Sequence, residues 1–208
     1  MPGLVTLHTF DAETAALVYL AAELAGGDEA AVREALGVAF HAVRPDWVEE
    51  VLLQTYLFAG FPRALNGMRE WRRISGRAAP EADAEDAYDV DAFRARGGVT
   101  CATVYGPMYE RLRVNIAALH PALDQWMVVE GYGKVLGRPA LDLGRRELCI
   151  IAACAVARQD RQLHSHLHGA LHAGVAAPVV TAALQHLRRL LSPADADRFT
   201  ALWKRVQG

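Results

Sequence analysis

The stretch RELCIIAACAVARQDRQLHSHLHGALHAG, residues 146–174, decides most of what this chain can be. A carboxylate, Glu147, opens an almost purely apolar run. After a short break, a second run carries four histidines within nine positions. Burial can raise the pKa of a carboxyl group, and imidazole titrates near neutrality. This combination is typical of acid–base chemistry at the edge of a dry core.

The composition favours an ordinary globular protein and excludes several classes. The 208 residues suffice for one domain or two small ones, with 52% apolar and 22% charged residues. A net charge of -2 gives no electrostatic reason to expect nucleic acid or a membrane as partner. We expect no signal peptide and no membrane span, because no basic and apolar leader and no apolar run of about 18 residues is visible.

Three cysteines form neither a CxxC motif nor a disulfide framework. Cys149 and Cys154 lie five positions apart in the apolar run and would point about 140° apart on a helix. We therefore expect small, buried, unpaired side chains. A reducing, cytoplasmic location suits this cysteine usage.

Strand signals are nearly absent, and Ala, Leu, Arg and Glu dominate, so we predict an all-α fold. The predicted helices span residues 12–25, 29–42, 46–58, 61–73, 105–118, 121–136, 144–157, 160–173, 178–190 and 193–206. Asp46 and Ser192 are predicted N-caps, Pro178 and Pro193 suit first turns, and Gly174 is expected to end the histidine helix.

Residues 76–98 are rich in Ala, Gly and acidic side chains and are predicted to form a solvated linker with at most a short helix. This linker divides the chain into residues 1–75 and residues 99–208. The C-terminal part contains the stretch that opens this section.

The two parts resemble each other. Without a gap, residues 16–54 match residues 147–185 at ten of 39 positions, which indicates an internal duplication. We therefore predict two repeated units that bury their faces against each other about a pseudo-twofold axis. Ala16 stands opposite Glu147, and Ala35 opposite His166, so only the C-terminal copy keeps the acid–base groups.

Two blocks of sequence resemble the carboxymuconolactone decarboxylase family, whose fold is shared with the alkylhydroperoxidase D-like proteins. Residues 120–174 are similar to the family's lead-in helix, its Arg-Glu-Leu helix and its His-Leu-x-Gly-Ala-Leu-x-x-Gly helix. Residues 48–68 are similar to its segment ending in Tyr-x-x-Gly-Phe-Pro. The resemblance implies an all-α alkylhydroperoxidase D-like bundle, here made of two repeats.

The resemblance also distinguishes two branches of the family. Peroxidase-type members carry Cys-x-x-Cys-x-x-x-His before the helix histidine. Counted back from His166, those positions hold Gln159 and Gln162. Glutamine forms neither a thiolate nor a disulfide, so the sequence favours the decarboxylase-like branch, which needs no cofactor because the lactone itself accepts the electrons.

The resemblance implies that Glu147 and His166 are the catalytic residues. The alternative for Glu147 is a structural role at the helix start, facing the helix dipole or paired with Arg145 or Arg146. The alternative for His166 is a core histidine bonded to a backbone carbonyl. As contacts of a small carboxylated substrate we predict His168, Arg138, Tyr56, Gly60, Phe61 and Pro62.

In single-domain members the Gly-Phe-Pro segment follows the histidine helix, whereas here it follows the degenerate copy. The two copies would then share one site, if packing brings residues 60–62 beside Glu147 and His166. His164, His168 and His172 form a stripe at i, i+4 and i+8, but no further ligand completes a metal site, and we predict none.

The predicted function is cofactor-free decarboxylation, or related chemistry, of a small carboxylated lactone. Two alternatives are a thiol-dependent alkylhydroperoxidase and a non-catalytic assembly or ligand-binding protein with a relict site. The resemblance further implies a homo-oligomer, a trimer or a dimer, since simpler family members form rings of small subunits.

Overall fold

Helices make up the regular structure of the protein in the computed structural model, which describes residues 6–83 and 88–208. The only β-type pairing within these residues is an isolated bridge between Leu7 and Val175. The predicted all-α fold is confirmed. The first half consists of α1 (Ala12–Gly26), α2 (Glu29–Ala42), α3 (Pro45–Ala59) and α4 (Phe61–Ser75).

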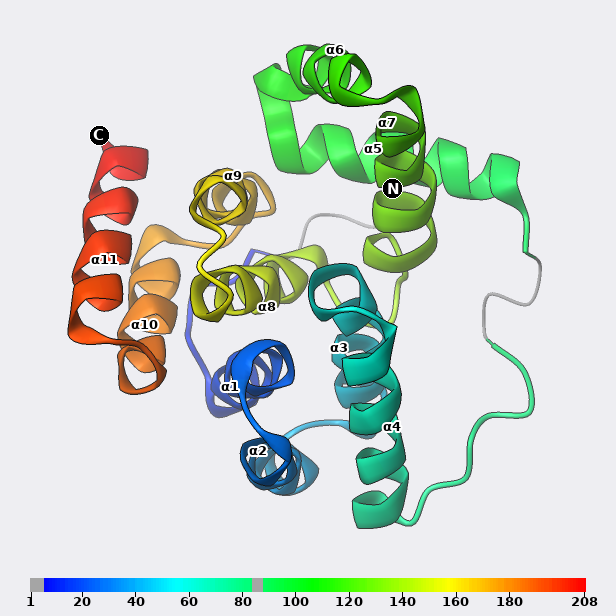
Figure 1. Cartoon of the computed structure of the whole chain (residues 1–208), viewed down its shortest axis with the longest axis vertical. Coiled ribbons are helices and arrows are strands. Elements are labelled where there is room, and N and C mark those ends of the chain that lie inside the picture. The colour runs from blue at the N-terminus through cyan, green and yellow to red at the C-terminus, as the bar shows by residue number, and fades with distance from the viewer. Residues whose placement is uncertain (1–5, 84–87) are drawn as a thin grey trace.

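The second half begins with a helical insertion and ends with four helices. The insertion contains α5 (Val90–Tyr105), a 3-10 turn (Gly106–Met108), α6 (Tyr109–Leu119), α7 (Pro121–Trp126) and the π-helix η2 (Met127–Leu136). The last four helices are α8 (Leu143–Val156), α9 (Asp160–His172), α10 (Ala177–Leu187), extended by a 3-10 turn (Arg188–Leu190), and α11 (Pro193–Gln207). In Figure 1, α8 runs through the middle of the molecule, between α1 and α9.

Most of the predicted helix ends are confirmed. Ser192 caps α11 by accepting a hydrogen bond from the Asp195 amide, and Pro178 and Pro193 lie in first turns. Gly174 follows α9 with φ 87°, a backbone conformation in which glycine avoids the steric cost of a side chain.

The prediction that Asp46 caps α3 is wrong. The N-cap is Arg44, and Pro45 occupies the first turn. Proline fixes φ near its helical value and needs no hydrogen-bond partner there, so the helix starts before Asp46. The Asp46 carboxylate instead accepts a hydrogen bond from the Arg44 guanidinium at 2.6 Å.

The predicted linker is too long, since α5 begins at Val90, inside residues 76–98. Asp89 caps α5 by accepting hydrogen bonds from the Asp91 and Ala92 amides, and Phe93 and Gly97 are buried in its first turns. The acidic composition suggested solvation, but two of these acids start a helix with a buried face. Residues 84–87 lie outside the described part of the chain.

The helices predicted over residues 105–118 and 121–136 also differ from the structure. The first starts later, at Tyr109, and the second changes from α to π geometry at Met127. A close crossing of η2 with α5 accompanies this change. A methyl group on Gly97 would collide with the Val128 carbonyl, and one on Gly133 with the Phe93 carbonyl.

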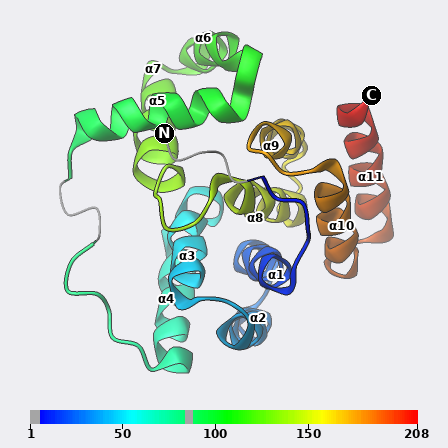
Figure 2. The ribbon, with the colours of Figure 1, turned by 180° about the vertical axis from the view of Figure 1, so that it is seen from behind.

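The helix boundaries support the predicted duplication. The starts of α1 and α2 precede those of α8 and α9 by 131 positions (12 to 143, 29 to 160), and those of α3 and α4 precede α10 and α11 by 132 (45 to 177, 61 to 193). The ungapped correspondence thus needs a one-residue step before α10. Contacts are reciprocal: α3 packs on α8, and α10 packs on α1. Such reciprocity is expected of two units about a twofold axis, and Figure 2 shows α1 and α8 adjacent between the outer helices.

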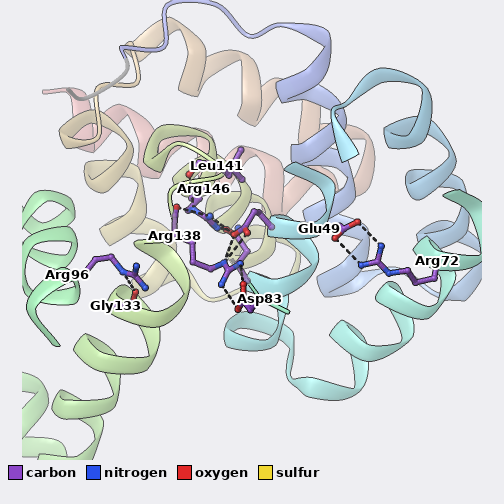
Figure 3. A network of polar contacts seen from close by, with 10 residues as sticks. Glu49, Arg72, Asp83, Arg96, Gly133, Arg138, Leu141 and Arg146 are labelled. Atoms are coloured by element: carbon purple, nitrogen blue, oxygen red, sulfur yellow. Dashed lines mark hydrogen bonds and ion pairs between the residues drawn. The ribbon is translucent and has the colours of Figure 1, made fainter. Parts of the chain in front are cut away.

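A buried polar network joins the two halves (Figure 3). The Arg146 guanidinium of α8 is fully buried and donates to the Glu50 carboxylate of α3 at 2.7 Å. It also donates to the carbonyl oxygens of Leu141 and Arg138, each at 3.1 Å. A buried charge needs such a complete set of partners, so the network fixes α3 against the start of α8.

Candidate active site

The centre of the candidate site is a buried carboxylate–imidazole pair. Glu147 lies on α8 and His166 on α9, and the Oε2 atom of Glu147 lies 2.8 Å from the Nδ1 atom of His166. Glu147 is fully buried and His166 is 5% exposed. The other carboxylate oxygen, Oε1, is buried and has no hydrogen-bond partner among the described residues. The structure therefore brings the two predicted catalytic residues together and leaves one oxygen unengaged.

An ion pair of Glu147 with Arg145 or Arg146 and a bond of His166 to a backbone carbonyl, two structural alternatives for these residues, do not describe their contacts. Arg145 donates to the Asp142 carboxylate at 2.9 Å and to the Asp11 carboxylate at 3.1 Å, and Arg146 is engaged with Glu50. Both arginines thus bind other acids. The hydrogen bond described for His166 joins it to Glu147 and not to a backbone carbonyl.

Close packing of α5 on α9 covers the pair. Gly169 follows His166 by one helical turn, and a methyl group at that position would lie 2.6 Å from Oε2 of Glu147 and 2.7 Å from Cγ1 of Val104. Because glycine has no side chain, position 169 leaves room for both the Glu147 carboxylate and α5. Gly169 belongs to the quoted histidine-helix motif, so the sequence contained a signal for this role.

The tyrosine and cysteine side chains around Glu147 stay protonated at neutral pH. Burial, with a smaller contribution from the Glu147 charge, raises the pKa of Tyr105 and of Cys154 to about 12. Tyr132 of η2 is buried, and its burial, followed by the charges of Tyr105 and Glu147, raises its pKa well above the ordinary value. The rings of Tyr105 and Tyr132 meet edge-on at 6.0 Å. At neutral pH, Glu147 therefore faces neutral phenols and thiols.

The segment that precedes the Gly-Phe-Pro turn approaches the pair through Phe58. The Phe58 ring meets the His166 ring edge-on, with centroids 6.0 Å apart. Phe58 was not among the predicted site residues, although it lies in the block that carried the resemblance.

The Gly-Phe-Pro turn itself lies at the surface between α3 and α4. Gly60 has φ 83° and joins the two helices, while Phe61 is 62% exposed and stacks on Tyr56 at 4.8 Å. Pro62 is exposed in the first turn of α4. None of these four residues has a described contact with Glu147 or His166.

His168 lies on the histidine stripe and faces away from the pair. Its ring contacts those of His164 and His172, with centroids 4.9 Å and 6.4 Å away. Burial and these two neighbouring histidines lower the pKa of His168. Within residues 6–83 and 88–208, no group of three or more His, Cys, Asp or Glu side chains is arranged to hold a metal ion.

Arg138, predicted to bind an anionic substrate, is held by two carboxylates. Its Nε atom lies 3.0 Å from the Glu50 carboxylate, and its Nη atoms bind Asp83 at 2.8 and 2.9 Å. Figure 3 shows Arg138 beside Arg146 in the network between the halves. This position serves that network rather than the Glu147–His166 pair.

The best-defined cavities of the described residues lie away from the pair. The largest, about 560 Å³, lies between α2 and α4. A void of about 10 Å³, lined by Phe58, Cys149 and neighbouring side chains, is barely large enough for one water molecule. Glu147 and His166 are buried, and Phe58 both lines this void and contacts the His166 ring.

Comparisons with known proteins agree with the resemblance seen in the sequence. Residues 121–200 match the model of the "Carboxymuconolactone decarboxylase family". The chain is also similar to "Peroxisomal protein 2" of Schizosaccharomyces pombe, with 31% identity over 130 residues. That match covers 61% of this chain and 60% of the relative, so the chain spans less than two thirds of the relative's length.

The length and apolar character of a helix decide whether it can span a lipid bilayer. In residues 6–83 and 88–208, none combines the length and apolar character that a membrane-spanning helix requires.

Proposed function

We propose that the chain, whose residues 121–200 match the carboxymuconolactone decarboxylase family, catalyses a cofactor-free proton transfer coupled to decarboxylation of a small carboxylated lactone. The observation that carries the proposal is the 2.8 Å contact between Glu147 and His166 in a dry environment. Both residues lie in the region that matches the family.

The proposed reaction breaks the bond between a ring carbon and its carboxylate. The electron pair of that bond moves into the unsaturated lactone and places negative charge on the carbonyl oxygen, while CO2 leaves. A proton must then return to a ring carbon, and charge on the oxygen must be stabilised until it does. A proton donor held in a site from which water is excluded can both protonate the ring carbon and stabilise the charge on the oxygen.

His166 is the proposed proton carrier, and Glu147 is its positioning residue. With Nδ1 bound to the carboxylate, the Nε2 atom is the ring nitrogen that remains for the substrate. A carboxylate on Nδ1 fixes the tautomer and stabilises the protonated ring. His166 would therefore donate its Nε2 proton to the carbanion and be reprotonated after release of the product.

Substrate entry requires a displacement of Phe58. This ring meets the His166 ring edge-on, and we propose that the substrate approaches the imidazole from this side. We include Phe58 in the proposed site as a wall of the pocket. His168, Arg138, Tyr56 and the 60–62 turn stay predictions that the described contacts do not link to the pair.

The proposal is tested by following carboxymuconolactone consumption by ultraviolet absorbance with the wild-type protein, Glu147→Gln and His166→Ala. We expect at least about a hundredfold loss of turnover in His166→Ala, since general acid–base catalysis contributes about 10²- to 10⁴-fold. His164→Ala is the matched control, because it removes an imidazole from the same helix outside the pair. Turnover that survives in both pair variants would reject the assigned roles, and its absence in the wild type would reject this substrate.

The thiol peroxidase alternative is disfavoured by the state of the cysteines. All three are buried and unpaired, and burial is the main cause that raises the pKa of each thiol to about 12. A nucleophilic cysteine requires an exposed, stabilised thiolate. The positions that would carry the reactive pair are Gln159 and Gln162.

The enclosed pair is the observation that favours a non-catalytic protein with a relict site as the second candidate function. In that case the pair variants would change stability and no measurable turnover. The cytoplasmic location and the homo-oligomeric state also stay proposals. The relative from Schizosaccharomyces pombe is named a peroxisomal protein, so localisation of a fluorescent fusion would distinguish these compartments.

A further inference from the structure

A well-defined cavity lies in the half of the molecule that lacks the acid–base pair. It measures about 560 Å³ and lies between α2 and α4, which are neighbours in Figures 1 and 2. Typical small-molecule sites measure about 300–1,000 Å³. Leu24, Val32 and Gly67 contribute apolar surface, and four arginines and three carboxylates complete the wall: Arg33, Arg63, Arg69 and Arg73 with Asp28, Glu29 and Glu70.

In the other half, ion pairs connect the equivalent elements. There, Arg198 of α11 binds Asp160 of α9 at 3.0 Å, and Arg158 binds Asp195 at 3.1 Å. With offsets of 131 for the α9 side and 132 for the α11 side, the equivalent positions in the first half are 66 with 29, and 27 with 63.

Neither ion pair is repeated at these equivalent positions, and the ion pair that does bridge α2 and α4 joins Arg33 to Glu70 at 2.8 Å. Asn66 stands opposite Glu29 and cannot form an ion pair with it. Arg63 donates to the carbonyl oxygens of Glu23, Leu24 and Gly27 at the end of α1. The two halves therefore differ in the side chains that face each other across this groove.

The wall of the cavity keeps guanidinium donors that no described residue uses. Arg33 donates to Glu70 through Nε alone, and Arg73 through Nε and Nη2, which leaves three Nη groups without a described partner. Arg69 forms no hydrogen bond or ion pair with any described residue. A guanidinium carries five N–H donors and favours carboxylate oxygens.

The wall carries four guanidinium groups and three carboxylates, an excess of one positive charge. Glu70 is shared by Arg33 and Arg73, whose hydrogen bonds lower its pKa to about 2. Asp28 caps α2 by accepting from the Ala31 amide. Glu29 is the remaining carboxylate, so the cationic side of the cavity, on α4 and Arg33, is where an anion would bind.

We propose that the α2–α4 cavity is a binding site for a small organic anion that carries carboxylates on an apolar frame. Arg69, Arg73 and Arg33 bind the carboxylates, and the surface of Leu24, Val32 and Gly67 contacts the frame. This site lies apart from Glu147 and His166 and does not depend on the function proposed for them.

The test is isothermal titration of the full chain with adipate at low ionic strength. We expect saturable one-to-one binding with a Kd below about 1 mM, and no binding of the neutral adipamide. Arg69→Gln and Arg73→Gln should each weaken adipate binding about tenfold, as expected for one charge-assisted hydrogen bond. Arg205→Gln is the matched control, because position 205 is the equivalent of 73 on α11 and lines no described cavity.

Several outcomes would overturn the proposal. Adipate that produces no heat up to about 20-fold above the expected Kd would reject the site. A Kd unchanged in Arg69→Gln and Arg73→Gln, with melting temperatures equal to that of the wild type, would place binding elsewhere. Inorganic phosphate that binds as tightly as adipate would show that the apolar surface contributes nothing and would reject the class of ligand.

Discussion

Arg146→Met should destabilise the protein far more than the loss of an exposed ion pair would. Arg146 is fully buried and makes four hydrogen bonds, of which the shortest, 2.7 Å, joins it to Glu50. Removal of one partner from a buried ion pair costs about 3–5 kcal/mol. Arg138 also binds Glu50 and would still neutralise it, so we expect the lower end, about 3 kcal/mol.

Arg72→Met is the matched control for this prediction. Arg72 binds Glu49 with two hydrogen bonds, at 2.8 and 3.0 Å, but the two side chains are 22% and 18% exposed. Water can replace the lost partner there, and exposed pairs contribute about 0–1 kcal/mol. Figure 3 shows both arginines. Each binds a glutamate, and they differ in burial, so the comparison of the two variants measures the effect of burial.

The measurement is urea unfolding followed by far-ultraviolet circular dichroism, together with thermal melting. For a chain of this size, 3 kcal/mol corresponds to a melting temperature lower by roughly 6–12 °C, and 1 kcal/mol to roughly 2–4 °C. Equal shifts in the two variants would refute the reasoning, because they would mean that the buried network contributes no more than a surface contact. A changed slope of the urea curve would indicate that Arg146→Met alters the cooperativity of the two halves.

Three further perturbations test the enclosure of the candidate site. Phe58→Ala removes the ring that contacts His166 and should destabilise the protein by about 2–3 kcal/mol, less than the loss of a fully buried Phe. Diethyl pyrocarbonate should then modify His166 faster than in the wild type. An unchanged rate of modification would show that Phe58 is no barrier. Gly169→Ala forces a methyl group to 2.6 Å from Glu147. The overpacking costs about 1–3 kcal/mol, and the higher helix propensity of alanine offsets about 1 kcal/mol of it. We therefore expect a clear loss of turnover with only a small loss in the free energy of unfolding. Burial raises the pKa of all three thiols to about 12, so they are neutral at pH 8 and should react with Ellman's reagent only on unfolding; fast labelling of the native protein would reopen the peroxidase alternative.

The fold was largely predictable, because helical periodicity and helix-end residues are local signals. Pro178, Pro193, Ser192 and Gly174 determine helix ends through their own backbone preferences. The failures are tertiary. The first turns of α5 are polar and Gly-containing, and they are stabilised by their crossing with η2 at Gly97 and Gly133, which no local pattern reveals.

The Glu147–His166 pair of the candidate site was predictable, because both residues belong to one sequence motif. Glu147 and His166 lie on consecutive helices joined by a short turn, which places the two helices side by side. The contacts of Arg138 depend on Glu50 and Asp83, 88 and 55 positions away. Phe58, rather than the exposed turn that follows it, contacts the pair. Sequence spacing within one helix does not determine which side chain reaches another unit.

The difference between the two halves is as much a difference of cover as of catalytic residues. Gly169 on α9 is buried under α5, whereas its equivalent on α2, Val38, is 43% exposed. Ala16 and Ala35, the equivalents of Glu147 and His166, are themselves buried, so what the first half lacks is the additional cover of α5 beside these positions. α5 lies before the region that matches the family, residues 121–200. The enclosure of the pair thus depends on a segment outside that match, and α5, with Val104 and Tyr105, is where differences in specificity should be sought.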